Sequence, residues 1–260
     1  MRKTGIVIPC YNEEKRLNSE AYLSALDKEP ELSFLFVDDG STDKTLQIIQ
    51  SLKDQRPAQI EILTLEQNSG KAEAVRSGMN RVIEDDFINV GYWDADLATP
   101  LETINDFCKL LNSRDTSLVM GSRVKLLGRH IERNPLRHYT GRIFATCASL
   151  LLNIGVYDTQ CGAKIFKNTA LLKQVFGRPF TVNWIFDVEM LARFEVISDQ
   201  SISQLSSHWH EYPLKEWIDI KGSKVKLKDF FISGLEFCTL FGYLRTPARK
   251  KYKDYILGTE

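Results

Sequence analysis

The stretch FLFVDDGSTD, residues 34–43, starts as a short apolar run and ends in carboxylates, a glycine and hydroxyl side chains. Similar apolar runs recur through the first half of the chain, and segments with helical patterning separate them. This alternation is typical of a parallel β-sheet covered by helices, and it predicts a doubly wound α/β core. The expected strands are Gly5–Pro9, Phe34–Val37, Ile60–Leu65, Ile88–Trp93 and Leu118–Met120.

Polar residues follow four of these strands. The first strand leads into PCYNE at 9–13, the second into Asp38 and Asp39, the third into NSG at 68–70 and the fourth into DAD at 94–96. In open α/β sheets the ligand binds beyond the carboxyl ends of the strands. We therefore expect these four strand ends to meet in one binding site.

The second half of the chain has a different pattern, which begins with a basic loop over Arg123–His138. The elements expected after it are a helix at Ile143–Ile154, a turn and strand at Asp158–Lys167, a helix at Asp187–Glu195 and a strand at Leu205–Tyr212. From Phe230 to Leu244 the chain is mostly apolar and aromatic. We expect one domain over residues 1–225 and an amphipathic helical tail over residues 226–260.

Composition excludes several classes of protein. The 34 basic and 34 acidic residues cancel, so no overall positive field favours nucleic acid as a partner. The five cysteines have no C-x-x-C spacing, which argues against a zinc site or a disulfide framework. The chain shows no signal-peptide pattern and no run near the roughly 20 apolar residues that span a bilayer. We therefore expect a cytoplasmic protein without a membrane-spanning helix.

The sequence YWDAD, residues 92–96, places two carboxylates after an apolar strand. Alternate residues of an extended segment point the same way, so Asp94 and Asp96 can face one site. Hard divalent cations take oxygen ligands, commonly one or two carboxylates together with substrate phosphates. The pair therefore predicts a site for Mg²⁺ or Mn²⁺ with Asp96 and Asp94 as its ligands.

An anion site is expected at NSGK, residues 68–71, because the free N–H groups at the start of a helix favour anions. The segment is not an ATP-binding Walker A loop. It lacks the upstream glycine of that motif, and Ala72 stands where the motif has a hydroxyl residue.

Taken together, these motifs resemble the family-2 glycosyltransferases. The resemblance rests on PCYNE, DDGSTD and DAD, with GSR at 121–123. The segment DTQCGAKIF at 158–166 is similar to the corresponding segment of dolichyl-phosphate β-glucosyltransferases, and FDVE at 186–189 and GSK at 222–224 continue the likeness. It extends from Gly5 to about Val225 and implies a GT-A fold with a nucleotide-sugar-binding half and an acceptor half.

The resemblance also implies roles for individual residues. Related dolichyl-phosphate mannosyltransferases have a glutamine metal ligand where this chain has Ala98, so metal binding should depend more on Asp96. The implied acceptor-binding residues are Arg123, Arg137 and Arg142, and the implied catalytic residues are Asp158, Asp187, Glu189 and Arg123. The implied donor-binding residues are Pro9, Tyr11, Asn12, Glu13, Asp38, Asp39, Gly70, Lys71, Asp94, Ala95, Asp96 and Lys224.

The activity implied is inverting, metal-dependent transfer of a sugar, expected to be glucose from UDP-glucose, to a polyprenyl-phosphate-type lipid. A lipid phosphate is already anionic near neutral pH, so this acceptor needs no general base. Two alternatives stay open. A soluble family-2 transferase acting on a saccharide hydroxyl would need Asp158, Asp187 or Glu189 as base, and a nucleotide-sugar-binding protein would have no turnover.

The apolar segment near the C-terminus predicts a helix that lies in the lipid headgroup region, on the cytoplasmic face of a membrane. The alternative is that the same side chains pack on the second lobe or form a dimer interface, and the sequence leaves formation of a homo-oligomer open. The apolar side chains are Phe230, Phe231, Leu235, Phe237, Leu240, Phe241 and Leu244, and the basic ones that follow are Arg245, Arg249, Lys250 and Lys251.

Overall fold

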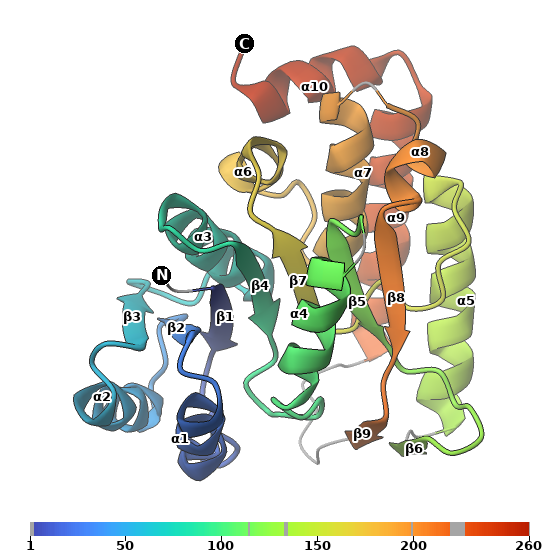
Figure 1. The fold of residues 1–260 in the computed structure, drawn as a ribbon. Helices are drawn as coiled ribbons and strands as arrows, with labels where there is room; N and C mark the ends of the chain where they lie inside the picture. Colours follow the sequence, from blue (N-terminus) through green and yellow to red (C-terminus); the bar gives the residue numbers. More distant parts are fainter. Residues whose placement is uncertain (1–2, 114, 133–134, 199, 219–226, 260) are drawn as a thin grey trace.

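The computed structural model describes residues 3–113, 115–132, 135–198, 200–218 and 227–259. Within this part of the chain, a seven-stranded sheet has the order β3-β2-β1-β4-β7-β5-β8, and helices lie on both of its faces (Figure 1). Strands β6 and β9 form a separate parallel pair. The strands are β1 Thr4–Cys10, β2 Leu32–Asp38, β3 Ile60–Thr64, β4 Asn89–Trp93, β5 Leu118–Ser122, β6 His130–Glu132, β7 Ala163–Lys167, β8 Trp209–Pro213 and β9 Glu216–Ile218.

The helices cover the two faces of the sheet unequally. They are α1 Ser19–Lys28, α2 Thr45–Gln55, α3 Lys71–Glu84, α4 Thr103–Ser113, α5 Pro135–Leu152, α6 Ala170–Gly177, α7 Phe186–Ser198, α8 Ile202–Ser206, α9 Leu227–Arg245 and α10 Ala248–Leu257. Ile6 and Ile8 of β1 pack in the hydrophobic cluster with α1, α2 and α4. Val7 between them packs in the other cluster, with α3 and α5 to α10. Alternate side chains of β1 therefore pack against the helices on opposite faces of the sheet.

Strand β7 determines where the second half of the chain meets the first. It is antiparallel to both of its neighbours, β4 and β5, whereas the other strand pairs of the sheet are parallel. Its first residue, Ala163, pairs with Trp93, the last residue of β4. Residues 157–162, which precede β7, therefore lie at the edge of the sheet where β4 ends. The expected doubly wound, mostly parallel sheet is confirmed.

Two boundaries differ from those expected. Helix α5 begins at Pro135 and not at Ile143, and proline is favoured at the first position of a helix because its missing N–H would have no partner there. The strand expected at 205–212 is shorter, because Ser201 and Gln204 form a capping box that starts α8. Strand β8 begins only at Trp209.

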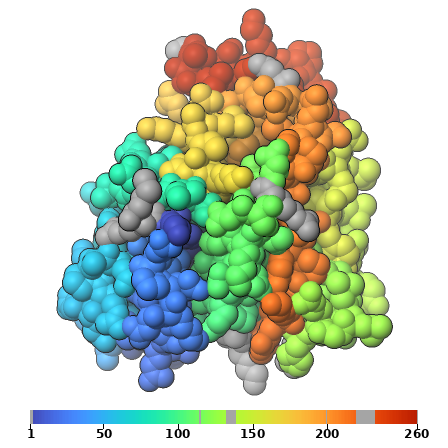
Figure 2. All heavy atoms as spheres, viewed as in Figure 1, coloured from blue at the N-terminus to red at the C-terminus, as the bar shows by residue number. Residues whose placement is uncertain are grey.

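Helices α9 and α10 share the core with α5 and α7. Leu240 and Leu244 of α9 are buried, and the ring of Phe237 packs against Phe144 of α5 with centroids 5.0 Å apart. Helix α10 lies at the end of the molecule opposite the carboxyl ends of β1 and β4 (Figure 1), and Figure 2 shows the same C-terminal residues, in red, at the top of the view. No helix in the described ranges is both long and apolar enough to cross a membrane. The side chains of Phe230 and Phe231 lie outside the described residues, and the division of the chain at residue 225 stays a prediction.

Candidate active site

The ends of β1 and β2 are joined by hydrogen bonds through Asn12. Its backbone is left-handed, with φ of 52°, which asparagine tolerates better than most residues. Its side-chain oxygen accepts a hydrogen bond from the N–H of Thr42 at 2.9 Å, and its own N–H donates to Ser41 Oγ at 3.0 Å. The N–H of Glu13 donates to Thr45 Oγ1 at 2.7 Å. The PCYNE and DDGSTD segments therefore form one rigid surface.

Asp39 joins the end of β2 to the loop that precedes α3. Its carboxylate accepts hydrogen bonds from the N–H groups of Ser69 at 2.7 Å and Gly70 at 2.9 Å. Burial raises the pKa of Asp39, and these two N–H groups oppose the rise. Gly40 is left-handed, with φ of 67°, and a Cβ there would overlap the backbone of Gln67. Asp38 is also buried, and its carboxylate accepts from Ser41 N at 3.4 Å.

Asp94 lies between the start of α3 and the segment before β7. Lys71, the first residue of α3, places its ammonium nitrogen 2.5 Å from Asp94 Oδ1. Burial opposes the charge on Lys71, but the negative charges of Asp94 and Asp187 raise its pKa. The N–H of Asp94 donates to the carbonyl of Gly162 at 3.0 Å, and a Cβ on Gly162 would overlap the Asp94 carboxylate. The glycine is therefore required for the close approach.

Asp96 follows in a tightly held turn. Tyr22 donates its hydroxyl to the carbonyl of Ala95 at 3.3 Å, and Asp96 accepts from the N–H of Ala98 at 3.2 Å. Leu97 has φ of 55°, a sparsely populated conformation that costs on the order of 1 kcal/mol. Burial and the negative charge of Asp94 raise the pKa of Asp96.

A divalent cation fits this carboxylate pair. The charge of Asp94 disfavours the ionised form of Asp96, and a cation between the two carboxylates would offset this repulsion. In the described part of the chain, no three Asp, Glu, His or Cys side chains gather to hold a metal. The remaining ligands would therefore come from water and from a bound diphosphate, as is usual for Mg²⁺.

Arginines line a pocket in the second half of the molecule. We call it the arginine pocket, and it is lined by Arg123, Gly141, Arg142, Phe144, Ala145 and residues 157–160. Arg123 makes a bidentate pair with Asp158, with Nε to Oδ2 at 2.6 Å and Nη2 to Oδ1 at 2.8 Å. Arg142 lies over the ring of Tyr157, 3.8 Å from its centroid. The side chain of Arg137 and all of Lys224 lie outside the described residues.

Comparison with known proteins shows the family. Residues 5–174 match the profile of Glycosyl transferase family 2. The chain belongs to glycosyl transferase family 2. It is 31% identical over 255 residues to a dolichyl-phosphate beta-glucosyltransferase of Trichomonas vaginalis, covering 93% of this chain and 72% of the relative. Proteins of that name from Saccharomyces cerevisiae and Homo sapiens are each 30% identical, covering 86% of this chain and 69% and 70% of the relatives.

Solved structures at lower identity confirm the GT-A fold. Glucosyl-3-phosphoglycerate synthase of Mycobacterium tuberculosis, in complex with Mn²⁺ and UDP-glucose, superposes with a TM-score of 0.65 at 18% identity, covering 95% of this chain and 80% of that one. TarS residues 1–349 of S. aureus, in complex with UDP, has a TM-score of 0.54 at 20% identity, covering 99% and 70%. At these identities the likeness shows the fold alone.

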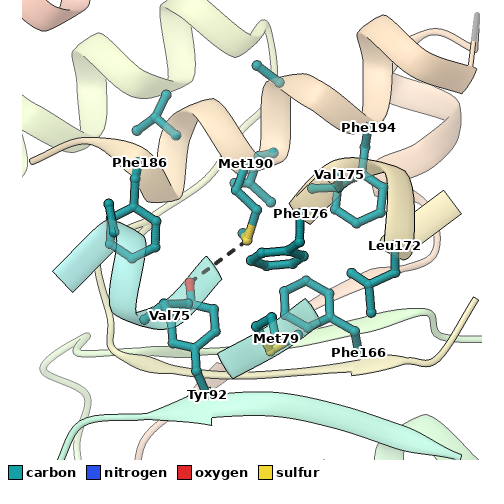
Figure 3. Packing of buried hydrophobic residues seen from close by; sticks show 14 of the residues in the cluster. Val75, Met79, Tyr92, Phe166, Leu172, Val175, Phe176, Phe186, Met190 and Phe194 are labelled. Atoms are coloured by element: carbon teal, nitrogen blue, oxygen red, sulfur yellow. Dashed lines mark hydrogen bonds between the residues drawn. The ribbon is translucent and has the colours of Figure 1, made fainter. Parts of the chain in front are cut away.

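Two carboxylates of this family-2 glycosyltransferase that sequence reasoning grouped together have different surroundings. Asp187 accepts hydrogen bonds from the Lys164 ammonium at 2.6 Å and from the Tyr92 hydroxyl at 2.5 Å. Tyr92 extends from β4 toward α7 in the core (Figure 3), and burial followed by the charge of Asp187 raises the pKa of Tyr92. Lys164 belongs to the segment DTQCGAKIF, but its pairing with Asp187 was not predicted, because a lysine inside an apolar strand carries no mark of its partner.

Glu189 lies apart from this group. It is fully buried and accepts hydrogen bonds from Arg193, from the Tyr252 hydroxyl at 2.8 Å, and from the backbone of Thr181 and Val182. These partners belong to α7, α10 and the segment before α7. This environment favours a structural role for Glu189 over that of a general base.

Proposed function

We propose that the chain transfers glucose from UDP-glucose to a polyprenyl phosphate, with inversion and in the presence of Mg²⁺ or Mn²⁺. One observation carries the proposal: residues 157–162 join an acidic site at Asp94 to the arginine pocket at Arg123. The relatives named dolichyl-phosphate beta-glucosyltransferase support the donor and the acceptor class. The structure in complex with Mn²⁺ and UDP-glucose supports the cation on the shared fold.

In the donor half, the chain provides fixed polar groups at the ends of four strands. Asp94 and Asp96 would hold the divalent cation, which would neutralise charge on the departing diphosphate. Lys71 holds Asp94 in place and adds positive charge at the start of α3, where helix N–H groups also favour an anion. We assign binding of the base and ribose to the segments that contain Asn12 and Asp38, at the ends of β1 and β2.

In the acceptor half, the pairing of carboxylates with cations favours a phosphate acceptor over a hydroxyl. Asp158 is paired with Arg123, and Asp187 with Lys164, so each carboxylate already contacts a cation of the chain. A phosphate oxygen needs no base. Arg123 bonds Asp158 through Nε and Nη2, which leaves Nη1 out of that pair to meet an anion. Orientation and charge then carry the rate.

The transfer reaction tests the proposal directly. A panel of nucleotide sugars is incubated with Mn²⁺, with and without a polyprenyl phosphate, and radiolabelled product is counted. UDP-glucose with the lipid phosphate should give the fastest turnover and a glucosyl-phosphate lipid. Turnover with a saccharide and none with the phosphate would support the hydroxyl acceptor. Nucleotide-sugar binding without any turnover would support the non-catalytic alternative.

We also propose that the protein binds the cytoplasmic face of a membrane as a peripheral protein. Exposed apolar side chains support this: on α9, Leu235 is 71% and Phe241 57% exposed, and on α5, which contacts α9, Tyr139 and Ile143 are 69% and 67% exposed. Such a surface suits the headgroup region of a bilayer. Helix α5 also lines the arginine pocket, so a lipid phosphate could enter from the same surface.

Flotation with anionic liposomes tests the membrane contact. The double variant Leu235→Ser with Phe241→Ser should float less than the parent chain. The matched control is Ile88→Ser, which removes an exposed apolar side chain just before β4, outside α5 and α9, and should float like the parent. A parent chain that stays at the bottom of the gradient at low salt would contradict the membrane contact.

A further inference from the structure

The carboxylate of Glu211 lies behind the arginine pocket on β8, the edge strand of the sheet. It accepts hydrogen bonds from the N–H of Tyr157, at 2.8 and 3.0 Å to its two oxygens, and from the N–H of Asp158 at 2.8 Å. Burial raises the pKa of Glu211, and the two N–H groups act against the rise. Glu211 thus holds two consecutive N–H groups of a loop that is 53 residues away in the sequence.

Tyr157 and Asp158 contact both arginines of the arginine pocket. The Asp158 carboxylate fixes Arg123, and Tyr157 meets Arg142 through its ring and through its carbonyl, which accepts from Nη1 at 3.4 Å. The Tyr157 carbonyl shares a peptide plane with the Asp158 N–H, so the bonds to Glu211 fix that carbonyl and the backbone from which both side chains extend. We propose that Glu211 is a positioning residue for the anionic acceptor, and that it sets the places of Arg123 and Arg142 through Tyr157 and Asp158. The inference rests on the proposed function.

An ionised side chain suits this task better than a neutral one. Two N–H groups that point to one place attract negative charge, and hydrogen bonds to charged acceptors are stronger than those to neutral ones. In Glu211→Gln the amide oxygen can replace only one carboxylate oxygen. The amide nitrogen then faces the N–H of Tyr157, donor against donor. Glu211→Asp keeps the charge but shortens the side chain, so it should keep part of the function.

The experiment measures steady-state kinetics with UDP-glucose and a short, water-soluble prenyl phosphate, which removes any effect of membrane binding. Glu211→Gln should raise the Michaelis constant for the prenyl phosphate about tenfold, the loss expected from one charge-assisted hydrogen bond. The Michaelis constant for UDP-glucose should change less than about twofold on the same reasoning. Glu211→Asp should give an intermediate value for the acceptor.

Asp106→Asn is the matched control. Asp106 accepts hydrogen bonds from the Tyr212 hydroxyl at 2.8 Å and from Lys215 at 2.7 Å. Tyr212 follows Glu211 on β8, so it points to the opposite face of the sheet. The control variant therefore disturbs the same strand without touching the arginine pocket, and its Michaelis constant for the acceptor should equal that of the parent.

Amide hydrogen exchange provides a second measurement that does not need turnover. The N–H groups of Tyr157 and Asp158 should exchange faster in Glu211→Gln and at the parent rate in Asp106→Asn. Absence of transfer by the parent chain would overturn the proposed acceptor itself, and with it this role of Glu211. If the parent transfers, equal acceptor constants in parent and Glu211→Gln, or equal increases for donor and acceptor, would overturn the positioning role alone.

Discussion

Replacing Gly162 by alanine should damage the donor site far more than it damages the fold. The added Cβ would overlap the carboxylate of Asp94, which must then move away from Lys71. The backbone at 162 is not left-handed, so alanine itself adds no strain there and should stabilise the chain by about 0.4–1 kcal/mol through the unfolded state. Overpacking in a filled site costs about 1–3 kcal/mol.

The net loss of stability should therefore be at most about 2.6 kcal/mol, or a fall in Tm of no more than about 10 °C for a chain of this size. Turnover should fall about 100-fold, because a displacement of about 1 Å in a reacting site has an effect of that order. Initial rates with Mn²⁺, UDP-glucose and a polyprenyl phosphate measure the turnover, and melting followed by circular dichroism measures the change in Tm.

Gly155→Ala is the control for this prediction. Gly155 lies in the loop after α5, and a Cβ there meets no atom within 4 Å. Its turnover should match that of the parent, with Tm equal or slightly higher. If Gly162→Ala folds and keeps turnover within about threefold of Gly155→Ala, a difference below 1 kcal/mol, then the position of Asp94 does not limit transfer and the reasoning is refuted.

Three further predictions follow from the charged groups. Asp96→Asn should abolish transfer. Burial and the negative charge of Asp94 raise the pKa of Asp96 in the folded chain, so its ionised form destabilises the metal-free fold and the variant should melt above the parent at neutral pH. The difference should shrink as the pH falls below that raised pKa and vanish below the pKa of an unfolded aspartate, about 3.9. Equal melting at neutral pH would contradict this. Arg123→Lys should raise the Michaelis constant for the acceptor about tenfold and leave that for UDP-glucose unchanged, because lysine cannot form the bidentate pair with Asp158. A change in the Michaelis constant for UDP-glucose alone would contradict this prediction. Glu189→Gln should lower the free energy of unfolding by about 3 kcal/mol, because Arg193 is then buried without a counter-charge. Urea titration measures this loss, and a loss below about 1 kcal/mol would contradict the explanation.

The parallel part of the fold was predictable because a simple sequence pattern indicates it. Apolar runs that end in polar residues indicate buried parallel strands, and parallel strands bring those ends together. The hydrogen bonds of Asn12 with Thr42 and of Asp39 with Ser69 confirm that three of the strand ends meet. The direction of β7 was not predictable, because a short apolar run reads alike in a parallel and in an antiparallel strand.

The functions of single carboxylates were harder to predict. Asp187 and Glu189 are two residues apart on α7, so about 200° of helix rotation separates them, and they meet different neighbours. One pairs with Lys164 and the other with Arg193, partners that the motif FDVE does not contain. The role of Glu211 was not predictable, because its partners are backbone N–H groups and every residue except proline has one. The assignment of site residues to donor and acceptor stays a prediction.

Residues 157–162 limit how this chain can change during evolution or in the laboratory. Through Asp158 and Gly162 the segment holds Arg123 at one end and Asp94 at the other. An insertion or deletion between them would shift both sites at once, so the two specificities cannot drift independently. An attempt to change the acceptor preference should replace residues 157–162 together with Glu211 on β8. A replaced loop without a matching residue at 211 would lack the hydrogen bonds that hold it in place.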